Sequence, residues 1–219
     1  MLSGHNLSIR EVWRIAALCS PCALADEARP LIQRSRQLVD ALAAQPRAIY
    51  GINTGFGPLS GFRISNDELG QHQINLLHHL FVGQGALFSA METRAIMVAR
   101  ANALARGYSG IREELIELLL AALNRGVLPE IPSEGSVGAS GDLVPLAHMG
   151  GLLVGLGYAR INGRRVPAAD ALREVGLAPV MLQCKEGLAL VNGTSVMTGL
   201  AALAVHEGHR LLRWMELLT

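Results

Sequence analysis

A chain of 219 residues is long enough to bury a substantial core and is most simply a single domain. Its formal net charge of +1 excludes the strongly basic composition that nucleic-acid binding or attachment to an acidic membrane surface would require. Half of the residues are hydrophobic, and the abundance of Ala and Leu favours helices. We therefore expect a mainly α fold with glycine-rich loops and one small β-hairpin.

Helices are expected over most of the first half of the chain. They are predicted at residues 9–18, 26–44, 65–82, 89–106 and 111–124. Ser8 is a candidate cap for the first, and Pro30 is tolerated in the opening turns of the second. Ser65 and Glu68 have the spacing of a capping box. The fourth helix is predicted to be long and amphipathic, with Glu92 in its first turn, where the helix dipole favours negative charge.

Glycine-rich segments are predicted to form loops, each shortly before a helix. They comprise residues 50–62, 127–138 and 192–193. The helix after the second loop begins near Gly141 or Asp142, and the helix after the third runs to Leu218. Helix N-termini carry free N–H groups and partial positive charge. If several converged on one pocket, they would attract a substrate carboxylate and stabilise developing anionic charge.

The predicted hairpin lies at residues 160–166, because Asn162-Gly163 suits a type I′ turn. A short helix at residues 168–175 follows it. The sequence contains no internal repeat or low-complexity segment that would indicate a solenoid or a linker.

Cysteine usage and the first residues indicate a cytoplasmic protein. Three cysteines, an odd number, fit a reducing compartment. Cys19 and Cys22 form a Cys-x-x-Cys motif, but no second pair completes a zinc site, so two helix-end thiols are favoured over a redox pair. Charged residues interrupt the first apolar run, which argues against a signal peptide. The most apolar stretch, residues 188–205, contains polar residues and glycines, and a buried helix preceded by a loop is favoured there over a membrane span.

Residues 139–141, Ala-Ser-Gly, have the chemistry to close into an electrophilic ring. The amide nitrogen of Gly141 can attack the carbonyl carbon of Ala139 with loss of water, and loss of the Ser140 hydroxyl as a second water leaves an exocyclic methylene. Glycine reaches the tight bend that this step needs, and Ala139 keeps bulk away from the carbonyl. An isolated Ala-Ser-Gly is usually only a turn of small residues, so the surrounding sequence decides between the two interpretations.

Three segments together resemble the aromatic amino acid ammonia-lyase family, which includes histidine, phenylalanine and tyrosine ammonia-lyases and related aminomutases. Residues 138–149 resemble the family's ring-forming signature, residues 50–59 its tyrosine-bearing loop and residues 188–195 its asparagine-bearing loop, in the family's order. The resemblance implies a methylidene-imidazolone cofactor made autocatalytically from Ala139, Ser140 and Gly141, and no metal. It also implies that residues 1–219 form one N-terminal cofactor-bearing domain of the family's helical fold. The final helix, about residues 195–219, would begin a helical bundle that is otherwise absent.

The resemblance also assigns roles to individual residues. Tyr50 matches the family's base, which removes the β-proton of the substrate. A phenol ordinarily ionises near about pH 10, so this base needs positively polarised surroundings; the alternative is a tyrosine packed in its loop. Asn192 is implied to hold the substrate against the ring, although an asparagine before Gly193 is also a common turn residue. Asp142 is implied to assist ring formation or to order the loop, and it can equally serve as an N-cap.

Substrate selectivity is implied to depend on His79 and Leu80, a pair that resembles tyrosine ammonia-lyases. An imidazole can hydrogen-bond a phenol hydroxyl, and a site built for a hydroxyl discriminates against an analogue that lacks it. The alternative is that His78 and His79 only occupy the flank of a helix. Gly57 and Leu143 are also expected at the substrate pocket. The residues that follow, Phe81-Val82, are bulkier than is usual in this family and would narrow the pocket, whereas His148 is expected to be structural.

The second half of the family's proteins is implied to supply an arginine for the substrate carboxylate, a second tyrosine, a glutamate near the amine and most of the bundle. No position here matches those motifs, and Arg213 is not assigned that role. The chain is therefore expected to be a fragment, half of a split enzyme or a shortened homologue. Its expected partners are an aromatic amino acid and either further copies, in a homotetramer, or a complementary C-terminal chain.

The predicted function is non-oxidative elimination of ammonia from an aromatic L-amino acid, tyrosine being favoured, to give an arylacrylate. A 2,3-aminomutase uses the same ring and returns the amine to the β-carbon, and a histidine ammonia-lyase differs only in substrate. An inactive fragment or scaffold subunit that retains the motifs is the alternative from another class.

Overall fold

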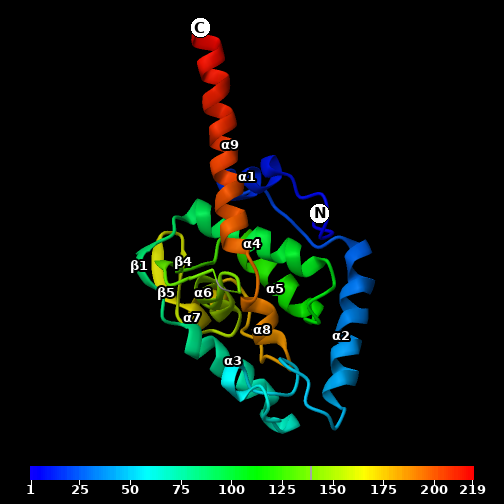
Figure 1. Cartoon of the computed structure of the whole chain (residues 1–219). Helices are drawn as coiled ribbons and strands as arrows, with labels where there is room; N and C mark the ends of the chain where they lie inside the picture. The colour runs from blue at the N-terminus through cyan, green and yellow to red at the C-terminus, as the bar shows by residue number, and fades with distance from the viewer. Residues whose placement is uncertain (139) are drawn as a thin grey trace.

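The computed structural model describes residues 1–138 and 140–219, and the fold is mainly α, as predicted (Figure 1). The helices of these residues are α1 (Ile9–Ala17), α2 (Arg29–Ala43), α3 (Leu69–Leu80), α4 (Ala90–Ala105), α5 (Glu113–Asn124), α6 (Leu143–Leu153), α7 (Ala168–Glu174), α8 (Glu186–Val191) and α9 (Ser195–Leu218). The strands are β1 (Gln84–Leu87), β2 (Leu128–Pro129), β3 (Pro132–Glu134), β4 (Tyr158–Ile161) and β5 (Arg164–Pro167). Short 3₁₀ turns occur at Asp26–Ala28, Gly57–Leu59 and Asn66–Glu68.

Helix α4 lies at the centre of the helical body. It contacts α1, α5 and α9, and also α2 and β2. Residues 95–101 are therefore all buried, on every side of the helix. The prediction of an amphipathic helix here was wrong, because neighbours surround α4 and leave no solvent-facing stripe. One residue of this buried stretch, Arg100, is charged.

Helix starts follow the capping signals in the sequence. Ser8 and Ser89 each accept the backbone N–H of a glutamate three residues later, and that glutamate binds back to the cap, so α1 and α4 begin where predicted. The Ser65 hydroxyl donates to Glu68 Oε2 at 2.6 Å, but a 3₁₀ turn follows and α3 starts only at Leu69. Helix α3 also ends before the predicted Val82, because Phe81 leaves the helical conformation and the chain continues into β1.

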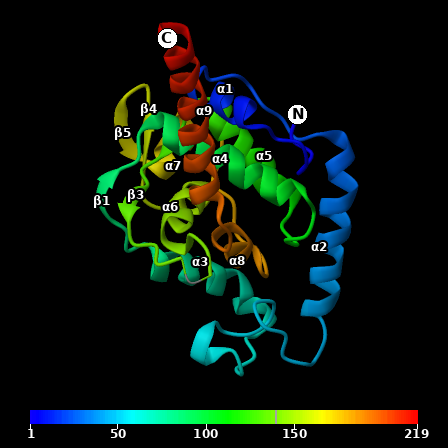
Figure 2. The ribbon, with the colours of Figure 1, turned by 45° about the horizontal axis from the view of Figure 1, so that its top comes forward.

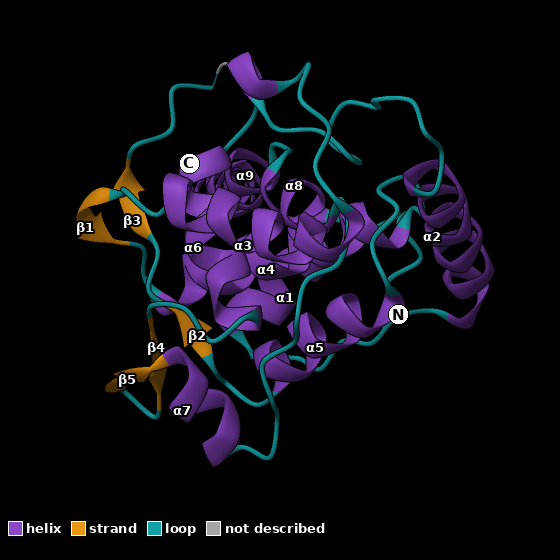
Figure 3. Ribbon diagram, turned by 90° about the horizontal axis from the view of Figure 1, so that it is seen from below, coloured by secondary structure: helices purple, strands orange, loops and turns teal. Residues whose placement is uncertain are grey.

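Two small antiparallel sheets lie on one side of the helices, with α2 on the opposite side (Figure 3). The predicted hairpin is confirmed as β4–β5, and Asn162 and Gly163 at its turn have φ of 49° and 77°, as a type I′ turn requires. Strand β2 extends this hairpin, and β1 pairs with β3. The predicted loop at residues 127–138 therefore contains two strands, which are too short to show alternating hydrophobicity.

Helices α3, α6 and α8 pack against one another and form a second group below α4 (Figure 2). Helix α8 was not predicted as a separate element. It belongs to a segment, Glu186–Leu218, that is long and apolar enough to span a membrane by length and composition alone. Asn192–Thr194 interrupt this segment, and α8 is buried against α3 and α6. A core helix satisfies the same criterion, so the observation is weak evidence for a membrane span.

A small apolar cluster of Val39, Ile52, Leu69 and Cys184 connects α2 and the loop after it to the start of α3 and to the segment before α8. The Cys184 thiol donates to the Ile52 carbonyl at 2.9 Å, and burial raises its pKa to about 11. Cys22 is also buried, with its thiol pKa raised to about 11, whereas Cys19 is exposed. The thiols of Cys19, Cys22 and Cys184 are free in this structure.

Candidate functional site

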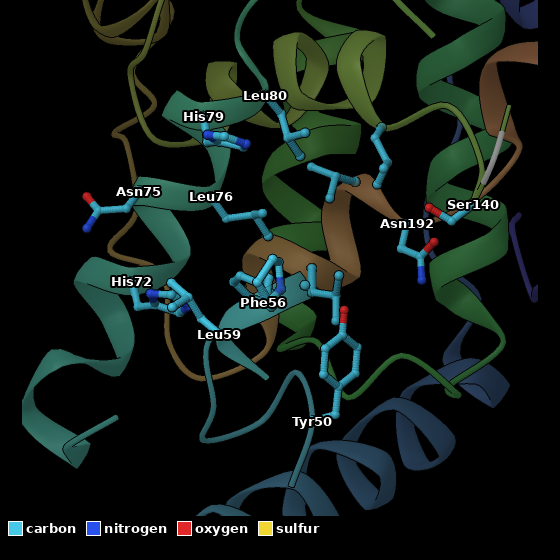
Figure 4. A pocket seen from close by; sticks show the side chains of 15 residues that line it. Tyr50, Phe56, Leu59, His72, Asn75, Leu76, His79, Leu80, Ser140 and Asn192 are labelled. Carbon is cyan, nitrogen blue, oxygen red and sulfur yellow. The ribbon is translucent and has the colours of Figure 1, made fainter. Parts of the chain in front are cut away.

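A cavity of about 790 Å³ lies between the loop of residues 50–59, hereafter the tyrosine loop, and helices α3, α6 and α8 (Figure 4). Its walls are mostly apolar, with a few polar groups, which is the usual character of a small-molecule site. The residues that line it are Tyr50, Phe56, Gly57, Pro58, Leu59, His72, Asn75, Leu76, His79, Leu80, Ser140, Leu143, Leu188, Val191 and Asn192. Seven of the predicted site residues, from four separate segments, thus line one cavity, whereas Gly141 and Asp142 are not among the residues that line it.

The tyrosine loop presents the phenol of Tyr50 at one wall. Its side chain is largely exposed and meets Phe56 edge-on, with ring centroids 6.5 Å apart. The hydroxyl points toward the cavity on the side where Asn192 lies (Figure 4). Asn53 is fully buried and holds the loop from within: its Oδ1 accepts the Ile49 N–H at 2.7 Å, and its Nδ2 donates to the Arg47 carbonyl at 3.0 Å.

Helix α3 supplies the polar groups of the opposite wall. His72, Asn75 and His79 are spaced at i, i+3 and i+7 and therefore share one helix face, toward the cavity. His79 lines the cavity and the neighbouring His78 does not, which separates the two members of the histidine pair. His72 and Asn75 were not predicted as site residues. Their spacing relative to His79, which places them on the same helix face, could have indicated them. His72 stacks on Phe56 at 4.7 Å, and burial lowers its pKa, which favours the neutral imidazole.

Phe81 does not narrow the cavity, contrary to expectation. Its ring packs against His148 on α6, with centroids 3.8 Å apart, and fills the space beside Gly151 and Gly157. The bulk of Phe81 is therefore accommodated behind α3, where two glycines make room for it. His148 is buried, and its Nε2 accepts the Gly83 N–H at 3.3 Å, which agrees with the expected structural role.

The ring-forming segment lies where α6 and α8 approach each other. Ala139, which is predicted to contribute the ring carbonyl, lies outside the described residues. Ser140 lines the cavity, and Gly141 has φ of +108°, a conformation that favours glycine. A Cβ at Gly141 would lie 2.4 Å from the Gly193 carbonyl oxygen, so a side chain cannot be placed there. These residues fit the implied methylidene-imidazolone, because the Gly141 position is restricted to glycine and the Ser140 side chain is at the cavity.

Asp142 connects this segment to α9. It occupies the N-cap position of α6 but makes no side-chain cap there. Its Oδ2 instead accepts the backbone N–H groups of Val196 and Met197, at 2.9 and 3.0 Å, and so caps α9. Its own N–H donates to the Gly193 carbonyl at 2.7 Å. These two N–H groups of α9 are therefore bonded to Asp142 and do not face the pocket as free donors. The expectation that several free helix N-termini converge on the pocket does not hold for α9.

Arg100 is a further polar residue near the site, besides His72 and Asn75, that was not predicted from the sequence. It is only 4% exposed and donates to the backbone carbonyls of Ala189 and Asn192, the latter at 3.0 Å. Burial lowers its pKa to about 10, and the negative charge of Asp142 partly offsets this effect. An arginine inside an otherwise apolar helical stretch was the available signal. Within the described part of the chain, no group of three or more His, Cys, Asp or Glu could hold a metal ion.

Comparison with known proteins identifies the family. Residues 7–219 match the family model described as aromatic amino acid lyase. The chain belongs to this family. It is 46% identical to a histidine ammonia-lyase from Geobacillus thermodenitrificans, and the match covers 100% of this chain but 44% of that protein. The chain thus spans less than half the length of this curated relative.

Solved structures of the family have the same fold. A tyrosine aminomutase from Streptomyces globisporus superimposes with a TM-score of 0.88 at 40% identity, covering 93% of this chain and 38% of that one. A histidine ammonia-lyase from Trypanosoma cruzi gives a TM-score of 0.91 at 34% identity, covering 97% and 42%. The comparisons thus establish the family and the fold, whereas the named substrates of these relatives differ.

Proposed function

We propose that this chain forms the cofactor-bearing part of an ammonia-lyase that acts on an aromatic L-amino acid, with tyrosine as the favoured substrate. In the net reaction, the amino acid loses its β-proton and its amine, and an arylacrylate and ammonium are formed. One observation carries the proposal: Tyr50, Ser140, Asn192 and His79 come from separate segments and line a single cavity. When present, the methylidene-imidazolone would supply an electrophile for the substrate amine.

The residues of the chain have distinct proposed roles around the substrate. Tyr50, whose hydroxyl points into the cavity, is the base that removes the β-proton. Asn192 lies beside Ser140 and can both donate to and accept from the substrate, which holds it at the ring-forming segment (Figure 4). Asp142 does not bind the substrate. It orders the ring-forming segment by accepting hydrogen bonds from the first turn of α9. Apolar side chains form most of the cavity wall around these groups.

The tyrosine preference rests on the wall formed by α3. His79 can hydrogen-bond the phenol hydroxyl of a substrate, and Leu80 offers an apolar surface to its ring. Gly57 and Leu143 complete the walls around a planar side chain. The likeness to a tyrosine aminomutase at 40% identity supports this preference. The histidine ammonia-lyase relatives support histidine as the other candidate substrate. Substitutions in the α3 wall therefore test the choice between tyrosine and histidine.

Replacement of His79 by Phe in the complete, active assembly should move the preference from tyrosine toward phenylalanine. Loss of the hydrogen bond leaves the tyrosine hydroxyl unpaired, and we expect the ratio of kcat/KM for tyrosine over phenylalanine to fall by about 100-fold or more. The measurement is initial rates of arylacrylate absorbance with tyrosine, phenylalanine and histidine. His78→Phe is the matched control, since the neighbouring imidazole does not line the cavity. An unchanged preference in His79→Phe would refute this role.

Ring formation is tested separately from substrate choice by intact mass. The wild-type chain in its active assembly should be lighter than its sequence by two waters, whereas Ser140→Ala should lack this loss because the leaving hydroxyl is gone. Turnover should be lost in the same variant. A wild-type mass equal to the unmodified sequence would favour the alternative, an inactive fragment or scaffold subunit of this fold.

A 2,3-aminomutase is the other candidate that an observation favours, because the tyrosine aminomutase is among the similar solved structures. It would return the amine to the β-carbon. Product analysis distinguishes the two activities: free arylacrylate and ammonium indicate the lyase, and a β-amino acid indicates the aminomutase.

The proposed partners beyond the substrate are further copies of the protein, in a homotetramer, or a complementary chain that provides the remaining part of the family's bundle. The exposed apolar residues at the end of α9 support an assembly of this kind. A cytoplasmic location is proposed from the odd number of free thiols.

A further inference from the structure

Arg100 is a buried charge to which the proposed reaction gives no role. It lies within residues 95–101, which are all buried at the centre of α4. A charged group in the interior is costly unless hydrogen bonds compensate for its lost hydration. The groups that accept its hydrogen bonds therefore indicate its role, and both belong to the end of α8 or to the loop that follows.

The guanidinium caps the C-terminal end of α8. Its Nη2 donates to the carbonyls of Ala189 and Asn192, and such terminal carbonyls have no partner within their own helix. The guanidinium also lies directly against Gly193, where a Cβ would be only 2.2 Å from Nη1. Because Arg presents several donors in a rigid planar fork, it can hold two carbonyls at once in a fixed relation.

Asp142 holds the other end of the same loop. Its carboxylate caps the first turn of α9, and its N–H binds the Gly193 carbonyl. Residues 192–194, hereafter the asparagine loop, thus lie between a buried cation at the end of α8 and a buried anion at the start of α9. Both charges are nearly excluded from solvent, at 4% and 2% exposure.

We propose that Arg100 is a positioning residue, which with Asp142 clamps the asparagine loop so that Asn192 faces the cavity beside Ser140. The side chain of Arg100 is not among those that line the cavity, and it acts through the backbone of the loop. The clamp also keeps the backbone of Gly193 against Gly141, and thereby holds Gly141 at its positive φ. The role of Asn192 in binding substrate rests on the proposed function. The contacts of Arg100 and Asp142 with the loop do not depend on it.

The test compares Arg100→Lys with Arg94→Lys in the complete, active assembly. Lysine keeps the positive charge but loses the planar fork, so the variant tests geometry rather than charge. Arg94 is a matched control on the same helix: its Nη1 donates to the Leu123 carbonyl at the end of α5, away from the cavity. Two measurements that do not depend on turnover are amide hydrogen exchange at residues 193–197 and the fraction of chains that have lost two waters.

In Arg100→Lys we expect faster amide exchange at residues 193–197 than in wild type and incomplete loss of the two waters. We also expect kcat to fall on the order of 100-fold with KM little changed, because a displacement of about 1 Å between reacting groups has such an effect. Arg94→Lys should leave all three unchanged. Wild-type exchange in Arg100→Lys, or the same changes in Arg94→Lys, would overturn the proposal. A wild-type chain without the two-water loss would instead contradict the proposed function, and the exchange measurement would still decide the role of Arg100.

Discussion

Single buried residues determine how the candidate site is held, and His148 shows this most simply. Its ring packs at a tilt against Phe81, its Nε2 accepts the Gly83 N–H, and it lies on α6. Burial lowers the pKa of His148 from 6.5 to about 4, so its imidazole is neutral in the folded protein near neutral pH. A neutral ring is required here, because a protonated Nε2 could not accept the Gly83 N–H.

This depressed pKa predicts a pH dependence of stability. Between about pH 6.5 and about pH 4, the unfolded chain binds a proton at His148 that the folded chain does not bind. The free energy of unfolding should therefore fall as the pH falls through this window, by at most roughly 3 kcal/mol from this residue. His148→Gln should remove this contribution, as measured by urea unfolding at pH 7 and pH 5. His5→Gln, at an exposed position, is the control, and an unaltered pH dependence in His148→Gln would contradict the assignment.

Helix α8 is the element on which the site most depends, since it carries Leu188 and Val191 and leads directly into the asparagine loop. It has only six residues, too few to be stable alone, so tertiary contacts must hold it. Arg100 holds its C-terminal end. At its N-terminal end, the fully buried Glu186 accepts hydrogen bonds from Nε and Nη2 of Arg112 at 2.8 and 2.9 Å. Arg36 Nη1 lies 3.6 Å from Oε1 of the same carboxylate.

Removing the charge of Glu186 should destabilise the protein through α8. Glu186→Gln leaves the guanidinium groups of Arg36 and Arg112 without a buried anion, which we expect to cost about 3 kcal/mol of unfolding free energy. Glu114→Gln is the matched control, because this carboxylate binds the same Arg112 at 2.8 Å but is 59% exposed. The control should change stability by less than about 1 kcal/mol. Equal losses in the two variants, measured by urea unfolding, would show that burial does not set the strength of this network.

On the scale of the whole molecule, the dominant feature is the projection of α9 away from the helical body (Figure 1). Its first turns are buried against α4, whereas its last turns expose large apolar side chains. The exposed residues are Leu211, Leu212, Trp214, Met215, Leu217 and Leu218. Apolar surface of this extent is typical of a protein interface, which is consistent with the proposed assembly.

A charge introduced into this apolar surface should prevent association without unfolding the body. Leu211→Glu combined with Leu218→Glu places two carboxylates on the same face of α9, at i and i+7. We expect the helical circular dichroism to be retained and the molar mass measured by light scattering to fall toward that of a single copy. Arg213→Glu, which changes charge at an exposed residue of the same helix, is the control. An unchanged molar mass in the double variant would show that this surface does not hold the assembly together.

Much of the fold was predictable because its signals are local. The cap at Ser8 and the Asn162-Gly163 turn depend on neighbouring residues only, and each lies where it was expected. The burial of α4 on all sides, the two strands within residues 127–138 and the separate helix α8 were not predictable. Each depends on contacts with segments far away in the chain, which leave no regular period in the sequence.

The sequence by itself determined the chemistry available to this protein: a triplet that can cyclise, a tyrosine and an asparagine in glycine-rich segments, and a histidine on a helix. Residue type and local spacing carry that information, because they set reactivity and backbone freedom. Only the tertiary structure decided which groups meet, that Phe81 turns away from the cavity, that Asp142 caps α9 and that Arg100 holds the asparagine loop. Close packing of distant segments produces these contacts, and side-chain direction in a packed interior depends on every neighbour at once.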